Sequence, residues 1–229
     1  MTYKIVLVRH GQSEWNLQNR FTGWVDVPLT KKGIEESKKC AEILKKNKFT
    51  FDVCYTSLLK RAIDTEEIIL KEMELKIPVK KNIGLMERFY GGLTGLNKDE
   101  MKKKYGEEQV HIWRRSYDVQ PPEISKKSEY YPGNMEMYKD VPRKMIPTTE
   151  SLKDNYERTI PYWKKKIEPV IKKGKKILVS AHGNSIRAII KYLDNVSNEE
   201  ITQIEIPTGK PLVYELDEKL KPIRHYYLE

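Results

Sequence analysis

The chain has 229 residues, of which 38% are hydrophobic and 33% charged, and its formal net charge is +10. This length suffices for a single domain with its own core, and no run approaches the ~18 apolar residues of a membrane span. Lysine supplies 33 of the 43 basic residues, mostly in doublets and triplets without interleaved aromatic residues, which favours a solvated surface or a cleft for small phosphates over a nucleic-acid-binding surface.

The first eighty residues alternate between strand and helix patterns. Tyr3–Val8 is mostly apolar and rich in β-branched residues, which predicts a buried strand. It starts so early that we expect no signal or transit peptide. This β-α-β-α-β order is typical of a parallel sheet covered on both faces. The other predicted elements are a loop at Glu14–Pro28, a helix capped by Thr30 with Ile34, Ala41 and Leu44 on its apolar face and an end near Asn47, a strand at Phe51–Tyr55, a helix beginning at Thr56-Ser57, and a strand at Ile77–Lys80.

Residues 85–149 interrupt this alternation. They are dense in glycine and proline, and two short helices are predicted inside them at Asp99–Tyr105 and Glu107–Arg115. A stretch this long with so much turn chemistry is typical of a functional insertion or lid. We therefore expect an excursion over the edge of the sheet.

Regular patterns return after residue 149. Thr149-Glu150-Ser151 is predicted to begin a helix that Pro161 bends and Gly174 closes. The strand that follows should end directly before His182-Gly183-Asn184. The remaining predicted elements are that strand at Lys176–Ala181, a helix at Ser185–Leu193, and closing strands at Leu212–Leu216 and Ile223–Tyr227.

Together these patterns predict an α/β fold, specifically a three-layer α/β/α sandwich with a mostly parallel central sheet. We expect a single domain over residues 1–229, with a lid insertion at about 85–149 and a C-terminal tail at about 222–229. Cys40 lies in a helix pattern and Cys54 in a strand pattern, and neither has ligand spacing around it. Two free, buried thiols indicate a reducing compartment, so we predict a cytoplasmic location.

Two of the predicted strands end in the same way. The first delivers Arg9-His10-Gly11 and a later one delivers Ala181-His182-Gly183, although the chain has only four histidines. Ligands of open α/β sheets lie outside the carboxyl ends of the strands, and neighbouring strands are only ~4.8 Å apart. The two imidazoles are therefore expected to converge on one small ligand.

Further cationic and polar groups are expected at the same edge. Arg61 lies one turn inside a helix that follows a strand end, and Asn184 opens another helix whose free backbone N–H groups attract anions. Arginines, helix-end amides and histidines suit a phosphoryl group, which spreads its charge over three oxygens. The pattern predicts a phosphoryl-binding site.

These residues also carry a resemblance to known enzymes. Arg9-His10-Gly11 followed by Glu14-Trp15-Asn16 resembles the signature of the histidine phosphatase superfamily. The wider pattern is similar to the family of cofactor-dependent phosphoglycerate mutases and extends nearly to the C-terminus. The segments that carry this likeness are Arg20–Trp24, Tyr55–Ala62, Tyr90-Gly91, Leu96–Lys98, Trp113–Arg115, His182–Arg187, Ile206–Gly209 and Pro211–Glu215.

The resemblance implies a role for each matching catalytic residue. His10 would be the nucleophile that carries a phosphoryl group, with one ring nitrogen unprotonated and the other bonded to a carbonyl. Arg9, Arg61 and His182 would clamp the transferring group, together with the amides of Gly183 and Asn184. Glu87 would donate and accept the proton of the substrate hydroxyl.

The resemblance also implies a set of binding residues and departs from the family at one position. Phe89 follows Glu87-Arg88 where the family often has histidine, and no catalytic role depends on that histidine. His111 and His225 match no catalytic position and are expected at the surface. The residues expected to bind the carboxylate and the phosphates are Arg9, His10, Ser13, Asn16, Thr22, Gly23, Arg61, Glu87, Arg88, Tyr90, Lys98, Arg114, Arg115, Gly183 and Asn184.

The implied reaction is the interconversion of 3-phosphoglycerate and 2-phosphoglycerate in glycolysis and gluconeogenesis. 2,3-Bisphosphoglycerate would be the cofactor that phosphorylates His10, and no metal is expected. The insertion and the tail after Pro222 are the expected covers that exclude water. The partners would be phosphoglycerates and further copies of the chain in a dimer or tetramer, with no nucleic acid and no membrane. The alternatives are a bisphosphoglycerate synthase or phosphatase that uses His10, a non-catalytic phosphate- or RNA-binding protein, and a metal-dependent mutase.

Overall fold

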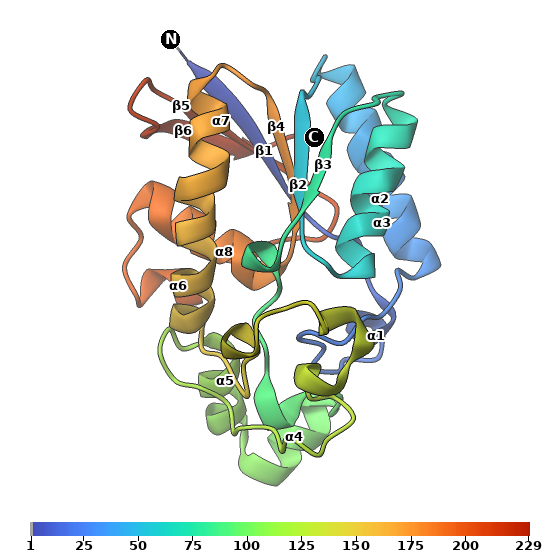
Figure 1. Cartoon of the computed structure of the whole chain (residues 1–229), viewed down its shortest axis with the longest axis vertical. Helices are drawn as coiled ribbons and strands as arrows, with labels where there is room; N and C mark the ends of the chain where they lie inside the picture. The colour runs from blue at the N-terminus through green and yellow to red at the C-terminus, as the bar shows by residue number, and fades with distance from the viewer. Residues whose placement is uncertain (1) are drawn as a thin grey trace.

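The computed structural model describes residues 2–229, which are built around a six-stranded sheet (Figure 1). The strand order is β3-β2-β4-β1-β5-β6, in which β3, β2, β4 and β1 pair in parallel, while β5 is antiparallel to β1 and β6 to β5. The predicted α/β fold with a mostly parallel sheet is confirmed. The strands are β1 Tyr3–Arg9, β2 Val53–Thr56, β3 Val79–Lys81, β4 Ile177–Ala181, β5 Pro211–Leu216 and β6 Pro222–Tyr227.

Helices cover both faces of the sheet because each inner strand is apolar on both sides. In β1, Ile5 and Leu7 face one cluster, with residues of α6, α7 and α8, while Val6 and Val8 face the other, with residues of α2 and α3. This alternation is the period of two that a pleated strand imposes. The helices are α1 Glu14–Leu17, α2 Lys31–Lys46, α3 Lys60–Glu72, α4 Lys98–Tyr105, α5 Glu107–Arg115, α6 Leu152–Tyr162, α7 Glu168–Lys172 and α8 Gly183–Asp194.

Several local predictions hold, and others need correction. Thr30 and Ser151 cap α2 and α6 through their side chains, and Pro161 comes just before a π-helical turn at Trp163–Ile167. The loop predicted at Glu14–Pro28 contains α1, and α3 starts three residues later than Ser57.

Ala41 and Leu44 lie on the buried face of α2 as predicted, whereas the placement of Ile34 on that face is wrong. Ile34 is exposed, whereas Gly33, Ser37, Cys40, Ala41 and Leu44 form the buried face. The reason is a backbone contact, because a Cβ on Gly33 would lie 2.1 Å from the carbonyl oxygen of Gln12. Cys40 and Cys54 are both buried and free, as expected.

Residues 85–149 lie beyond the carboxyl ends of the parallel strands, below the sheet in Figure 1. They pack through two apolar clusters of their own. One joins Trp24 and Phe89 to Tyr138, and the other joins Phe21 to Met101 and neighbouring side chains. Short 3-10 turns complete the segment and its surroundings at Ile83–Leu85, Gly91–Leu93, Pro132–Asn134, Glu136–Tyr138, Arg143–Met145 and, later in the chain, Glu200–Thr202.

The C-terminal residues do not cover the strand ends, so that expectation is wrong. Pro222–Tyr227 pair with β5 as the edge strand β6, and Leu228 packs into the apolar cluster beneath α2 and α3. Backbone pairing and burial of Leu228 hold the segment against the sheet. His111 and His225 are exposed, as predicted. No helix within residues 2–229 is long and apolar enough to cross a membrane.

Candidate active site

The two histidines at the strand ends meet, as the sequence predicted. β1 and β4 are neighbours in the sheet, and the amide of His10 donates to the carbonyl of Ala181 over 3.0 Å. The ring centroids of His10 and His182 are 5.0 Å apart, with the edge of one ring facing the other. Both rings are buried. The sheet register therefore places two imidazoles at one point.

His10 is arranged as a nucleophile. Its Nδ1 lies 2.7 Å from the carbonyl oxygen of Gly11, and because a carbonyl only accepts, Nδ1 carries the proton. Nε2 accepts a hydrogen bond from Arg61 Nε over 3.3 Å. Burial, with Arg61 and Arg9 nearby, holds the pKa of His10 well below its ordinary value of 6.5. The ring is thus neutral, with a lone pair on Nε2.

Arg61 is held in place by backbone carbonyls. Its Nη1 donates to Val25 O over 2.9 Å and its Nη2 to Gly23 O over 2.8 Å, and the side chain is buried. Gly23 has φ +55°, and a Cβ there would lie 3.2 Å from the Phe89 ring. The loop that holds Arg61 therefore needs glycine at this position.

His182 is fixed from behind by a hydroxyl. Its Nε2 lies 2.7 Å from Ser57 Oγ, while Nδ1 is buried and has no hydrogen-bond partner among residues 2–229. Burial, followed by the charges of Arg61 and Arg9, lowers the pKa of His182 well below 6.5. His182 is therefore a second neutral imidazole that touches His10 and does not itself line the cleft.

Glu87 lies at the centre of a network of polar side chains. Its Oε1 accepts from Asn184 Nδ2 over 2.7 Å, from the Asn184 amide over 3.2 Å and from the Arg88 amide over 2.7 Å. Asn184 Nδ2 also lies 3.2 Å from Tyr90 Oη, and Asn184 Oδ1 accepts from Arg187 over 3.2 Å. Buried on the cleft wall, Glu87 has the position and the fixed orientation that a proton carrier needs.

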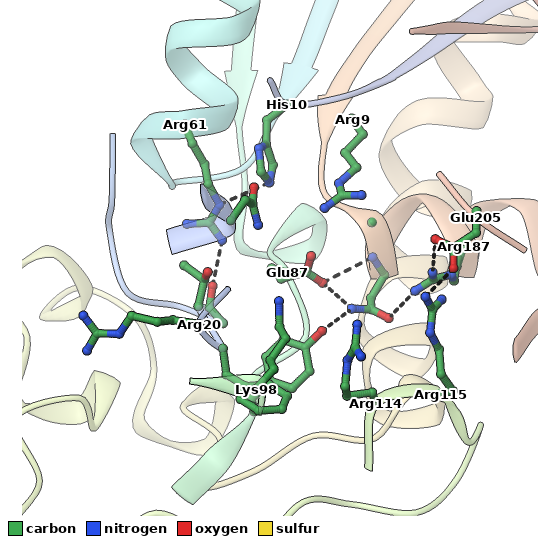
Figure 2. Close-up of a pocket in the computed structure, with 17 residues that line it drawn as sticks. Arg9, His10, Arg20, Arg61, Glu87, Lys98, Arg114, Arg115, Arg187 and Glu205 are labelled. Carbon is green, nitrogen blue, oxygen red and sulfur yellow. Dashed lines mark hydrogen bonds and ion pairs between the residues drawn. The ribbon is translucent and has the colours of Figure 1, made fainter. Parts of the chain in front are cut away.

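The cleft that these residues border is small, with a volume of about 160 Å³. In Figure 2, His10, Arg9 and Arg61 lie on one side, Lys98, Arg114 and Arg115 lie on the opposite side, and Glu87 lies between them. Seven lining side chains are cationic and two are carboxylates, so the lining has an excess of five positive charges. Burial lowers the pKa of Lys98, and nearby Arg114 lowers it further. The full lining is Arg9, His10, Asn16, Arg20, Phe21, Thr22, Gly23, Arg61, Glu87, Tyr90, Lys98, Arg114, Arg115, Gly183, Asn184, Arg187 and Glu205.

Two predicted binding residues lie outside the cleft. Ser13 caps α1, where its Oγ accepts from the Asn16 amide over 3.3 Å and so holds Asn16 at the cleft. Arg88 is fully buried, donates to the carbonyl of Arg114 over 2.9 Å and lies 4.6 Å from the centre of the Tyr90 ring. Both therefore support residues that line the cleft.

Four lining residues were not predicted. Arg20, Phe21 and Arg187 belong to segments that carried the family resemblance, so the signal was present without an assignment. Glu205 had no local signal, because a single glutamate in a loop does not reveal which arginines it will meet.

The lining favours an anion over a cation. Within residues 2–229, no group of three or more histidine, cysteine or acidic side chains lies together in a way that could hold a metal ion. The absence of a metal requirement remains a prediction. An organic cofactor that fits this lining must itself be strongly anionic.

Comparison with known proteins gives one family match and several structural likenesses. Residues 5–228 match the model of the histidine phosphatase superfamily (branch 1). The fold is similar to a mycobacterial glucosyl-3-phosphoglycerate phosphatase (TM-score 0.74, 19% identity, covering 98% of this chain and 97% of that one). It is also similar to alpha-ribazole phosphatase from Shigella flexneri (TM-score 0.71, 19% identity, covering 98% of this chain and 95% of that one). A third similar structure is phosphoglycerate mutase from Bacillus anthracis str. Sterne (TM-score 0.70, 20% identity, covering 100% of this chain and 92% of that one).

Proposed function

The chain belongs to branch 1 of the histidine phosphatase superfamily, whose members are phosphoryl-transfer enzymes, and we propose that it is a phosphoglycerate mutase dependent on 2,3-bisphosphoglycerate. It would interconvert 3-phosphoglycerate and 2-phosphoglycerate through a phosphohistidine at His10, as a metal-independent isomerase of glycolysis and gluconeogenesis in the cytoplasm. We propose that it assembles as a homo-oligomer.

One observation carries the proposal, namely the cations on both sides of the cleft. Arg9 and Arg61 flank the nucleophile, while Lys98, Arg114 and Arg115 lie on the opposite side, where a second anionic group would bind (Figure 2). A phosphohistidine carries about −2 and a phosphoglycerate about −3 at pH 7. Their sum of about −5 matches the excess of five positive charges in the lining. A substrate with a phosphate group and no second anionic group would leave the far cations without a partner.

The proposed mechanism follows from the protonation states. Nε2 of His10 would attack a phosphorus atom of the bound phosphoglycerate without first losing a proton. It carries none, because the proton of the neutral ring lies on Nδ1 and is donated to Gly11 O. The N–P bond forms as the P–O bond to the glycerate oxygen breaks, and that oxygen takes a proton from Glu87. In the reverse transfer, the other hydroxyl returns a proton to Glu87 as it takes the phosphoryl group. Arg9 and Arg61 neutralise the charge on the transferring group, which supplies much of the rate in a loose transition state.

Arg9, Arg61, Lys98, Arg114 and Arg115 would hold 2,3-bisphosphoglycerate, which would supply the phosphoryl group that first loads His10. The residues present fit this cofactor, since its two phosphates and its carboxylate correspond to cations on both sides of the cleft. The side chain of Glu87 lies between the two sides of the cleft (Figure 2), where it could exchange a proton with the hydroxyl of a bound glycerate.

The test is to incubate the protein with 2,3-bisphosphoglycerate labelled in its phosphates and then to assay mutase activity in the presence of a chelator. Acid-labile label on His10 together with isomerisation of 3-phosphoglycerate is expected. His10→Ala should lose both the label and turnover while keeping the circular dichroism spectrum of the folded protein. Failure of the wild-type protein to take up label would refute the proposal.

A phosphatase that uses the same His10 is the second candidate. Two of the three solved structures named above are phosphatases, and a likeness at about 20% identity reflects the fold alone. The two activities share the loading step and differ in whether water or a glycerate hydroxyl accepts the phosphoryl group. Phosphate release faster than isomerisation would favour the phosphatase.

A further inference from the structure

Glu205 places a negative charge inside a cleft that is otherwise lined with cations. Its side chain is 69% exposed and lines the cleft, and its carboxylate forms ion pairs with Arg115 and with Arg187, the latter over 3.7 Å (Figure 2). Glu87 is the other carboxylate of the lining, and it is bonded to Asn184. Glu205 is therefore the carboxylate that neutralises arginines on this side of the cleft.

The two arginines need a counter-ion when no ligand is bound. Arg187 is more than nine-tenths buried, and burial together with the nearby charge of Arg115 lowers its pKa to about 10, while Glu205 opposes that change. Arg115 Nη1 is buried and has no hydrogen-bond partner among residues 2–229. Two neighbouring guanidinium groups that are partly desolvated repel each other, and a carboxylate between them offsets that repulsion.

The backbone on either side of Glu205 is held firmly, whereas its side chain is not enclosed. Arg187 Nε donates to Ile204 O over 2.7 Å, and Arg9 Nη1 donates to Ile206 O over 2.8 Å. The segment is thus anchored to the cleft by two arginines, and the exposed carboxylate can turn into solvent without moving the backbone. This is the geometry of an exchangeable counter-ion.

We propose that Glu205 competes with the second anionic group of the substrate for Arg115 and Arg187, and so sets the affinity of the cleft for ligands with two anionic groups. This inference rests on the proposed function. A phosphoglycerate must displace the carboxylate in order to pair with both arginines, which reduces its affinity. Inorganic phosphate beside His10 leaves Glu205 in place. The residue therefore determines specificity and takes no part in the chemical step.

The test is calorimetry of 3-phosphoglycerate and of inorganic phosphate with the wild-type protein and with Glu205→Gln, which keeps the shape and removes the charge. The variant should bind 3-phosphoglycerate about three- to tenfold more tightly, the upper range for an exposed ion pair with two partners, and phosphate within about twofold of wild type. In steady-state assays KM should fall while kcat is unchanged, because the lost competition affects substrate binding alone.

Two controls separate this role from a general charge effect. Glu199→Gln removes an exposed carboxylate six residues earlier that does not line the cleft, and should leave both affinities unchanged. In an Arg115→Gln background, the effect of Glu205→Gln on 3-phosphoglycerate should shrink, since the contested partner is gone.

Three results would count against the inference, and they differ from one another. Equal or weaker binding of 3-phosphoglycerate by Glu205→Gln would show that Glu205 organises the arginines instead of competing for them. An equal gain for phosphate, or for Glu199→Gln, would reduce the effect to net charge. If neither the wild-type protein nor the variant binds 3-phosphoglycerate, the proposed function fails and this inference fails with it.

Discussion

Replacing Glu66 by glutamine is expected to stabilise the protein above pH 7. Glu66 lies on α3, its side chain is 1% exposed, and its Oε2 is buried without a hydrogen-bond partner among residues 2–229. Burial raises its pKa from 4.5 to about 7, and the charge of Glu67 adds to this effect while Lys81 opposes it. At pH 8 the fold therefore holds a desolvated carboxylate that glutamine would replace by a neutral amide of similar shape.

The magnitude and its sign follow from the shift. Between pH 4.5 and about 7 the folded state of Glu66 binds a proton that the unfolded state has lost, so stability falls as pH rises through this window. A shift of about two and a half pKa units, at about 1.36 kcal/mol each, lowers the free energy of unfolding by about 3.4 kcal/mol above pH 8. Between pH 5 and pH 8.5 the loss is about 2.5 kcal/mol.

The assay is urea unfolding of wild type and Glu66→Gln at pH 5 and pH 8.5. The difference in free energy of unfolding between the variant and wild type should rise by about 2.5 kcal/mol from pH 5 to pH 8.5. Taking the difference from wild type cancels the contribution of all other titrating groups. Glu67→Gln, an exposed change one position along the same helix, should stay within about 0.5 kcal/mol of wild type. A difference between Glu66→Gln and wild type that is the same at both pH values would refute the reasoning.

Three further predictions concern the site and its support. Burial, Arg61 and Arg9 hold the pKa of His10 well below 6.5, so its labelling by 2,3-bisphosphoglycerate should persist as pH falls through 6.5. Rapid-quench labelling that drops with a midpoint near pH 6.5 would contradict the neutral state of His10. Glu87→Gln should lower kcat by about 10²- to 10⁴-fold and change KM little, since the amide keeps the contacts but carries no exchangeable acid proton. Gly33→Ala should lower the thermal midpoint through a loss of about 1–3 kcal/mol, because its Cβ would meet the carbonyl oxygen of Gln12 at 2.1 Å; an unchanged midpoint would mean that the loop yields freely.

The sheet and its order of elements were predictable because their signals are local. The continuous apolar, β-branched run in β1, and the side chains of Thr30 and Ser151 at helix starts, identify elements without knowledge of tertiary contacts. The assignment of Ile34 to the buried face failed for the opposite reason. Its exposure depends on how closely Gly33 approaches the backbone of Gln12, about twenty residues earlier in the chain. The periodicity of apolar residues in a helix carries no information about that distance.

The candidate site divides in the same way. His10 and His182 were predictable because strand ends of a parallel sheet meet at one edge. Arg88 carries the right charge, but its direction is set by the carbonyl of Arg114 and by the Tyr90 ring, which only the packed excursion brings near. Glu205 lies ninety residues beyond Arg115 in the chain, so their ion pair is a product of the fold alone.

The way the cleft arginines are held explains how so much positive charge remains available to a ligand. Four of them donate to neutral backbone carbonyls, which fix the guanidinium groups without cancelling their charge. These pairs are Arg9 with Ile206, Arg20 with Gly95, Arg61 with Gly23 and Val25, and Arg187 with Ile204. Carboxylates in those places would have stabilised the empty cleft and weakened its attraction for phosphate. Of the two carboxylates that line it, Glu87 lies where a proton must move and Glu205 where a ligand can displace it, so neither opposes the anion beside His10.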